Sequence, residues 1–254
     1  MTRMKKKDKT QQLLEQIQIL KLRYIEENLK TITKEAADKQ WSHHDYLHEL
    51  ISGEVCRRTD NKIQRRIKSA RFPVIKTLES FDFSWPQKIN PQAIKDLFGL
   101  RFLEDHSNVI LMGGVGLGKT HLACSLGYQA CLSDHSVYYT TAVDIINQLT
   151  AANAAYRLKQ ELAKYLKPRI LICDEVGYIP IDKTGADLLF QVISGRYEKS
   201  STIFTTNKSY KKWSEIFNND ATLTSAILDR VLHHSHTITI QGKSYRMRDK
   251  IEES

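Results

Sequence analysis

Residues 113–120 are Gly113-Gly114-Val115-Gly116-Leu117-Gly118-Lys119-Thr120, a stretch that matches in full the pattern GxxxxGK followed by Ser or Thr. Four apolar residues, 109–112, come directly before it, and a helical pattern that starts at His121 follows it. The pattern needs a strand before it and a helix after it, so this context favours a phosphate-binding loop. The alternative is an ordinary glycine-rich turn before a helix.

The chemistry of this loop is suited to a nucleoside triphosphate. Glycines let successive backbone N–H groups point inward and bind an anion, and the start of the next helix adds positive potential. We expect the Lys119 ammonium to reach the β- and γ-phosphates and the Thr120 hydroxyl to ligate Mg²⁺. Residues 113–121 are therefore the predicted binding segment, with ATP and Mg²⁺ as its ligands.

Short apolar runs alternate with helical segments along the rest of the chain. After residues 109–112 the runs are 137–139, 170–173, 202–205 and 237–240. Runs of this length that are rich in β-branched residues suit strands buried on both faces. Because helical segments separate them, we expect a parallel five-stranded sheet with right-handed crossovers, and hence an α/β fold.

Two carboxylates, Asp174 and Glu175, follow the apolar run 170–173 directly. They should lie at the carboxyl end of a buried strand, where open α/β sheets bind ligands. Neighbouring buried carboxylates are costly unless a cation neutralises them, so the pair indicates a metal. We expect Asp174 to hold Mg²⁺ and Glu175 to polarise the attacking water, which predicts ATP hydrolysis as well as binding. By itself, an apolar run followed by Asp-Glu is a weak indication of such a site. Its position downstream of Lys119 makes the indication specific.

Polar residues on later elements complete the predicted site. Asn207 ends the next strand, where its amide could position water against the γ-phosphate, although Asn is also an ordinary turn residue. Arg230 lies on the helix that follows and is placed to complete a neighbouring subunit's ATP site. The alternative for Arg230 is an exposed arginine paired with Asp229 or solvent. Arg196 competes for the subunit-interface role, and Arg246 is a further candidate phosphate contact.

Charge and composition divide the chain of 254 residues into parts. The net charge is +9, and residues 1–75 hold 17 basic and 10 acidic residues, which leaves only +2 for the remainder. Helical spacing and the lack of proline before Pro73 predict a basic helical N-terminal domain over 1–75. An aromatic linker over 76–90 and an ATPase domain over 91–254 should follow. A basic excess in one region favours a nucleic-acid partner.

Basic residues gather on the predicted helix from Cys56 to Phe72, where Asp60 is the only acid. Such a face can neutralise several phosphates of DNA, and the absence of a base-reading motif predicts largely sequence-independent binding. A solvated helix face is the alternative. The candidate DNA contacts are Arg57, Arg58, Lys62, Arg65, Arg66 and Lys68.

The sequence carries no signal for a membrane or for export. No apolar run approaches the roughly 20 residues of a membrane helix, and the basic N-terminus leads into no apolar region. The four cysteines form no CxxC pair, which favours reduced thiols over a zinc site or disulfides. We therefore expect a cytoplasmic protein without a membrane partner.

Longer phrases accompany the two motifs in a fixed order: Phe81-Asp82-Phe83, GGVGLGKTHLA (113–123), ILICDEVGYIP (170–180), LLFQVISGRYE (188–198), STIFTTN (201–207) and ILDRVLHHSHTITIQGKSYR (227–246). Together they resemble the IstB-like helper ATPases of bacterial insertion sequences, over nearly the whole chain. The resemblance implies an αβα domain of the AAA+ type behind a small helical domain. It also implies ATP-dependent self-association on double-stranded DNA and delivery of that DNA to a partner transposase. A DNA-contacting helix is implied after Thr141, where Arg157 and Lys159 stand.

Two other functions remain open from the sequence. One is a replicative helicase loader of the DnaC type, although a loader with a zinc-binding N-terminal domain would show a CxxC-type cluster that is absent here. The other is a DNA-binding scaffold with a vestigial ATPase site. The intact Lys119, Asp174 and Glu175 argue against a vestigial site.

Overall fold

The computed structural model describes residues 9–178 and 180–247. The chain forms two compact units, Met1–Arg65 and Arg66–Ser254. Within the described ranges, no helix combines the length and the apolar character needed to cross a membrane.

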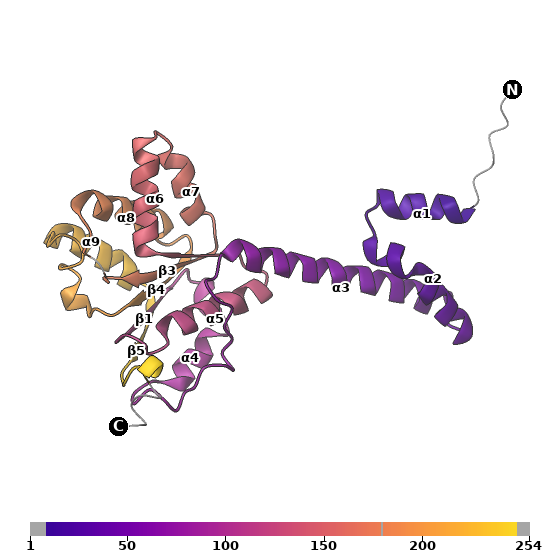
Figure 1. Cartoon of the computed structure of the whole chain (residues 1–254), viewed down its shortest axis with the longest axis horizontal. Coiled ribbons are helices and arrows are strands. Elements are labelled where there is room, and N and C mark those ends of the chain that lie inside the picture. The colour runs from indigo at the N-terminus through magenta and orange to yellow at the C-terminus, as the bar shows by residue number, and fades with distance from the viewer. Residues whose placement is uncertain (1–8, 179, 248–254) are drawn as a thin grey trace. The chain divides into compact units, whose positions relative to one another are not determined.

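The first unit is helical, as its apolar spacing predicts. It contains α1 (Lys9–Ile19), α2 (Arg23–Asp38) and most of α3 (His43–Ala70) (Figure 1). A capping box starts α3, because the Asp45 N–H donates to Ser42 Oγ at 3.1 Å and the Ser42 hydroxyl donates to the Asp45 carboxylate at 2.7 Å. A small apolar core joins the helices and is made of Ile17, Ile25, Ile32 and Leu50.

The second unit is built on a five-stranded parallel sheet, which confirms the predicted fold class. The strands are β1 (Asn108–Gly113), β2 (Val137–Thr141), β3 (Ile170–Val176), β4 (Ser201–Thr206) and β5 (Ser235–Ile240). Their order across the sheet is β2-β3-β4-β1-β5, and every neighbouring pair is parallel. The central strands β3, β4 and β1 are buried over most of their length because helices cover both faces of the sheet.

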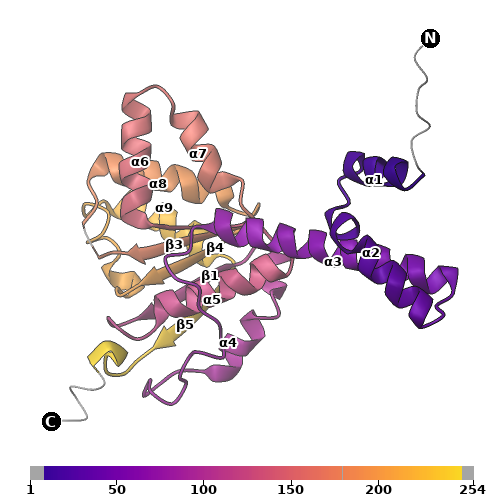
Figure 2. The ribbon, with the colours of Figure 1, turned by 45° about the vertical axis from the view of Figure 1, so that its right-hand side comes forward.

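Helices on both faces give this unit three layers (Figure 2). One face carries α4 (Pro91–Leu97) and α5 (Lys119–Leu132). The other carries α6 (Ala142–Ala154), α7 (Leu158–Leu166), α8 (Lys183–Arg196) and α9 (Ala221–Leu232). The described part of this unit also contains the short 3₁₀ helices η1 (Arg101–Leu103), η2 (Tyr210–Lys212) and η3 (Tyr245–Met247). Each face therefore buries its own apolar core.

Side chains fix where most of these helices begin. Thr141, Asp182 and Asp220 each accept a hydrogen bond from the backbone N–H three residues ahead, at the starts of α6, α8 and α9. These bonds satisfy N–H groups that a helix leaves unpaired in its first turn. Asn90 caps the start of α4 in the same way, at 3.1 Å from the Ala93 N–H. The linker before α4 is held by Phe81 and Phe83, which pack against the core beside α5.

Candidate nucleotide-binding site

The strand order brings the predicted motifs to one edge of the sheet. The glycine-rich loop follows β1, the Asp174–Glu175 pair lies at the carboxyl end of β3, and Asn207 follows β4 directly. Strand β4 lies between β3 and β1, and all three run in the same direction. The three motifs therefore come from adjacent strand ends, although up to 94 residues separate them in the sequence.

The glycine-rich loop ends at Gly118, which has a φ of 84° and precedes the first residue of α5. This left-handed conformation favours glycine. Among the described residues no side chain caps the start of α5, in contrast to α6, α8 and α9. The first N–H groups of α5 are therefore left for an anion, such as a phosphate group.

Lys119 lies over this loop and is buried. Its ammonium donates to the Gly114 carbonyl at 2.7 Å and to the Tyr178 hydroxyl at 3.4 Å. Burial lowers the pKa of Lys119, and the nearby Asp174 and Glu175 carboxylates act in the opposite direction. A phosphate group offers this buried cation a stronger acceptor than a neutral carbonyl does.

The Asp174 carboxylate is almost fully buried and accepts hydrogen bonds from three hydroxyls. Thr120 Oγ1 lies 3.0 Å from both carboxylate oxygens, and Tyr139 Oη donates to Oδ2 at 2.6 Å. Thr205 Oγ1 donates to Oδ1. Burial raises the pKa of Tyr139 most, and its hydrogen bond to Asp174 raises it further. The phenol therefore stays protonated and donates its hydrogen bond to the carboxylate. This cluster of hard oxygen atoms suits Mg²⁺, and it contains both predicted metal ligands.

Glu175 differs from its neighbour, because its side chain is exposed. The pairing of β3 with β4 shifts register between Cys173 and Val176, and Glu175 has a φ of 62° at this irregularity. Its backbone N–H donates to Thr205 Oγ1 at 2.9 Å. A bulge of this kind redirects a side chain, and strained backbone of this type gathers at functional sites. Asp174 therefore points into the protein while Glu175 is open to solvent and substrate.

Asn207 is half-buried at the end of β4, and its Oδ1 is a buried atom without a hydrogen-bond partner among the described residues. Buried polar atoms nearly always have a partner, so an unpaired one calls for an explanation. A water molecule or a phosphate-bound water at this strand end would satisfy Oδ1. The role of Asn207 in orienting water stays a prediction.

Arg230 lies at the opposite edge of the sheet from the glycine-rich loop. The carbonyl of the next residue, Val231, accepts a hydrogen bond from Asn108 Nδ2 at the first residue of β1, at 3.1 Å. The loop begins after the last residue of β1, about 17 Å away at the usual rise per strand residue. The Arg230 guanidinium donates to the Ala226 carbonyl at 2.9 Å and stacks on Phe190. It therefore cannot serve the ATP site of its own chain, which leaves a neighbour's site or a structural role.

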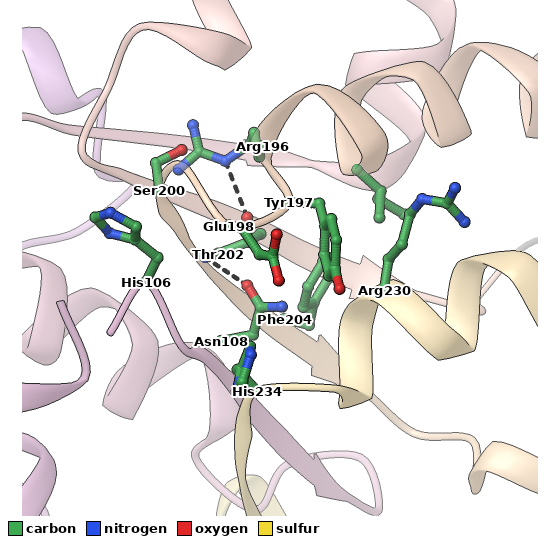
Figure 3. Close-up of a pocket in the computed structure, with 11 residues that line it drawn as sticks. His106, Asn108, Arg196, Tyr197, Glu198, Ser200, Thr202, Phe204, Arg230 and His234 are labelled. Atoms are coloured by element: carbon green, nitrogen blue, oxygen red, sulfur yellow. Dashed lines mark hydrogen bonds between the residues drawn. The ribbon is translucent and has the colours of Figure 1, made fainter. Parts of the chain in front are cut away.

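Arg196 is buried, and the prediction that it competes with Arg230 at a subunit interface is wrong. Figure 3 shows the two arginines around one pocket. The Arg196 guanidinium donates to the carbonyls of Tyr165 and Ser201, both at 2.6 Å, and to Thr202 Oγ1 at 2.9 Å. A side chain that is 2% exposed and bound in this way cannot reach another subunit. The sequence around Arg196 did not indicate this burial, because an arginine is ordinarily expected at the surface and is seldom fully buried.

The segment after β5, which contains the candidate phosphate contact Arg246, lies against the glycine-rich loop. The Tyr245 N–H donates to the Gly116 carbonyl at 2.9 Å. Arg246 is exposed, and its charge lies close enough to Lys119 to lower the pKa of that lysine. The structure thus brings Arg246 near the predicted phosphate site.

The basic residues of α3 have different surroundings. In the first unit, Arg57 pairs with Glu27 at 2.6 Å and Arg58 pairs with Glu54 at 2.8 Å, whereas Lys62 and Arg65 are exposed. In the second unit, Arg66 pairs with Asp134 and donates to the Cys131 carbonyl at 3.0 Å. The remaining candidates, Lys68, Arg157 and Lys159, are exposed. Exposed cations without an acidic partner are the ones best placed to contact a polyanion.

Known proteins resemble this chain in both sequence and fold. The family model described as IstB-like ATP binding protein matches residues 15–253. An ATP-binding protein of insertion sequence IS232 from Bacillus thuringiensis subsp. berliner is 41% identical over 243 residues, which are 96% of this chain and 97% of the relative.

Among solved structures, AMPPCP-bound DnaA from Aquifex aeolicus gives a TM-score of 0.57 at 17% identity, over 72% of this chain and 57% of that chain. The DnaC helicase loader gives 0.55 at 20% identity, over 65% of this chain and 96% of that chain. At these identities the likeness concerns the fold, which is that of AAA+ P-loop domains. With the family model spanning both motifs and nearly the whole length, this chain belongs to the family of IstB-like ATP-binding proteins.

Proposed function

We propose that this protein is a Mg²⁺-dependent ATPase of an insertion sequence that self-associates on double-stranded DNA and delivers the DNA to a partner transposase. The observation that supports hydrolysis best is the pair at the end of β3. Asp174 is buried among hydroxyls, and Glu175 is exposed at a bulge beside it. A binding module needs only the first of these carboxylates, whereas hydrolysis needs a second one that faces water.

Different residues of the site bind the phosphates, hold the metal ion and activate the attacking water. The glycine-rich loop and Lys119 bind the phosphates, and Thr120 and Asp174 would hold Mg²⁺. The ion, when bound, would neutralise charge that develops on the phosphate oxygens. Glu175 accepts a proton from the attacking water, and the Asn207 amide orients that water. The hydrogen bonds of Lys119, Thr120 and Asp174, the exposure of Glu175 and the unpaired Oδ1 of Asn207 support these assignments.

Completion of the site in trans follows from the position of Arg230. The site of one chain lacks this guanidinium, because Arg230 lies near the amino end of β1 and the loop lies beyond its carboxyl end. In a ring or filament, head-to-tail contacts bring one subunit's α9 to the next subunit's loop. ATP-dependent self-association is thus part of the proposal.

DNA is the proposed surface on which the subunits assemble. The net charge of +9 and the exposed Lys62, Arg65, Lys68, Arg157 and Lys159 support contacts to phosphate groups. The transposase partnership rests on the insertion-sequence relative. The likeness to the DnaC helicase loader concerns the fold alone and does not favour helicase loading.

Two variants test hydrolysis against binding alone. Lys119→Ala should lose ATP binding in calorimetry, because a buried cation that binds phosphate directly is removed. Glu175→Gln should bind Mg²⁺–ATP as the wild type does, lose hydrolysis, and remain on DNA when ATP is present. Wild-type hydrolysis by Glu175→Gln would assign water activation to another residue, and no hydrolysis by the wild type on DNA would favour a scaffold.

A further inference from the structure

Two hydroxyls that the sequence did not single out lie on the two oxygens of Asp174. Tyr139 Oη donates to Oδ2 at 2.6 Å, and Thr205 Oγ1 donates to Oδ1. They come from β2 and β4, the strands on either side of β3. We propose that Tyr139 and Thr205 are positioning residues that hold the Asp174 carboxylate in the orientation needed for Mg²⁺ with ATP. This inference rests on the proposed Mg²⁺-dependent function.

Asp174 interacts with the charge of the nearby Lys119, but this interaction alone does not fix the orientation of the carboxylate. Asp174 is 2% exposed, and within residues 9–178 and 180–247 it forms no ion pair. A buried carboxylate has lost its hydration, so hydrogen bonds must replace the water. The torsion that turns an aspartate carboxylate about its own axis has only a broad preference. One donor on each oxygen, from opposite sides, fixes that plane.

Thr120 also donates to both oxygens, but its role differs from that of the other two hydroxyls. It is itself a proposed metal ligand, and its oxygen would offer a lone pair to Mg²⁺ while its proton stays available to Asp174. Tyr139 and Thr205 have no such second role toward the metal, so they are the donors assigned to keep the carboxylate in place. A carboxylate oxygen can accept about two hydrogen bonds, so the carboxylate keeps capacity for a water on the metal.

Thr205 has a second contact that Tyr139 lacks. Its Oγ1 accepts the backbone N–H of Glu175 at 2.9 Å, at the point where β3 and β4 lose register. One hydroxyl therefore links the carboxylate of Asp174 with the backbone that presents Glu175. Loss of the Tyr139 hydroxyl should affect metal affinity alone, whereas loss of the Thr205 hydroxyl should also slow hydrolysis at saturating Mg²⁺.

The experiment measures metal and nucleotide affinity separately in Tyr139→Phe and Thr205→Val. Mn²⁺ affinity is measured by electron paramagnetic resonance with a non-hydrolysable ATP analogue, and analogue affinity without metal is measured by calorimetry in EDTA. Each variant should weaken Mn²⁺ binding about tenfold, the usual effect of one hydrogen bond to a charged group. Metal-free nucleotide affinity should stay at the wild-type value. Thr205→Ser, which keeps the hydroxyl, should recover most of the loss.

Tyr138→Phe is the matched control, because Tyr138 is the preceding residue of β2 and its hydroxyl bonds to Arg71 at 3.3 Å instead. This variant should bind Mn²⁺ as the wild type does. Wild-type Mn²⁺ affinity in both Tyr139→Phe and Thr205→Val would overturn the inference. An equal loss of metal-free nucleotide affinity would also overturn it, since that result indicates damage to the loop. If the wild type binds the analogue without any metal dependence, the proposed Mg²⁺ site itself is wrong.

Discussion

The Phe81 ring lies so close to Gly118 that a Cβ atom on this glycine would come within 2.6 Å of Phe81 Cε2. The linker before α4 therefore supports the loop that precedes α5. Because Gly118 also has a φ of 84°, a side chain there meets both a steric and a backbone penalty.

We expect Gly118→Ala to lower the free energy of unfolding by about 1–3 kcal/mol, from overpacking and backbone strain. Chemical denaturation of the nucleotide-free protein measures this change. Gly114→Ala is the matched control in the same loop, since the nearest atom to its added Cβ is Leu117 Cδ1 at 3.6 Å, an ordinary contact. Equal stability of the two variants would show that Phe81 does not constrain the loop.

Arg230 should act on the ATP site of a neighbouring subunit. Arg230→Ala alone and Glu175→Gln alone should each be inactive, for different reasons. In a mixture, some sites combine an intact Glu175 with an Arg230 from the other variant, so hydrolysis should reappear. The measurement is ATP hydrolysis on DNA at several mixing ratios. Absence of recovery, with mixed oligomers shown to form, would assign Arg230 a structural role on Phe190.

The DNA contacts should involve the exposed cations of α3. We expect Lys62→Gln with Arg65→Gln to flatten the log–log dependence of DNA affinity on salt by about two units, because each phosphate contact contributes about 0.9. The loss should be similar for unrelated DNA sequences. Arg57→Gln is the control, since its guanidinium already pairs with Glu27 at 2.6 Å. A salt dependence of the double variant equal to that of the wild type would mean that this face of α3 contacts protein or solvent.

Arg196 should matter for stability and not for communication between subunits. Arg196→Met leaves the buried carbonyls of Tyr165 and Ser201 without their donor, and we expect a loss of about 3 kcal/mol in the free energy of unfolding. Arg101→Met, at an exposed position, should change stability by less than about 0.5 kcal/mol. Lost hydrolysis with unchanged stability would instead restore an interface role for Arg196.

Much of the site was predictable because its motifs are local. The glycine-rich loop needs only an apolar run before it and a helix after it, and both stand within about a dozen residues of Lys119. Asp174 and Glu175 follow their strand directly. Since parallel strands end at the same edge of a sheet, the sequence also placed Asn207 beside them. The surroundings of Arg196 were not predictable, because its partners come from α7 and from the loop before β3.

The sequence by itself determined the α/β class with its parallel sheet, the nucleotide-binding loop and the acidic pair, because each rests on apolar periodicity or on residues adjacent in the chain. Only the tertiary structure decided which side chains surround Asp174. Tyr139 and Thr205 lie 35 and 31 residues from it and reach it because β2 and β4 flank β3. It also decided that Arg230 lies near the opposite end of β1 from its own loop and that Arg57, Arg58 and Arg66 already have partners. The physical reason is that strand order and helix packing depend on contacts between distant residues, which no local pattern of a single sequence records.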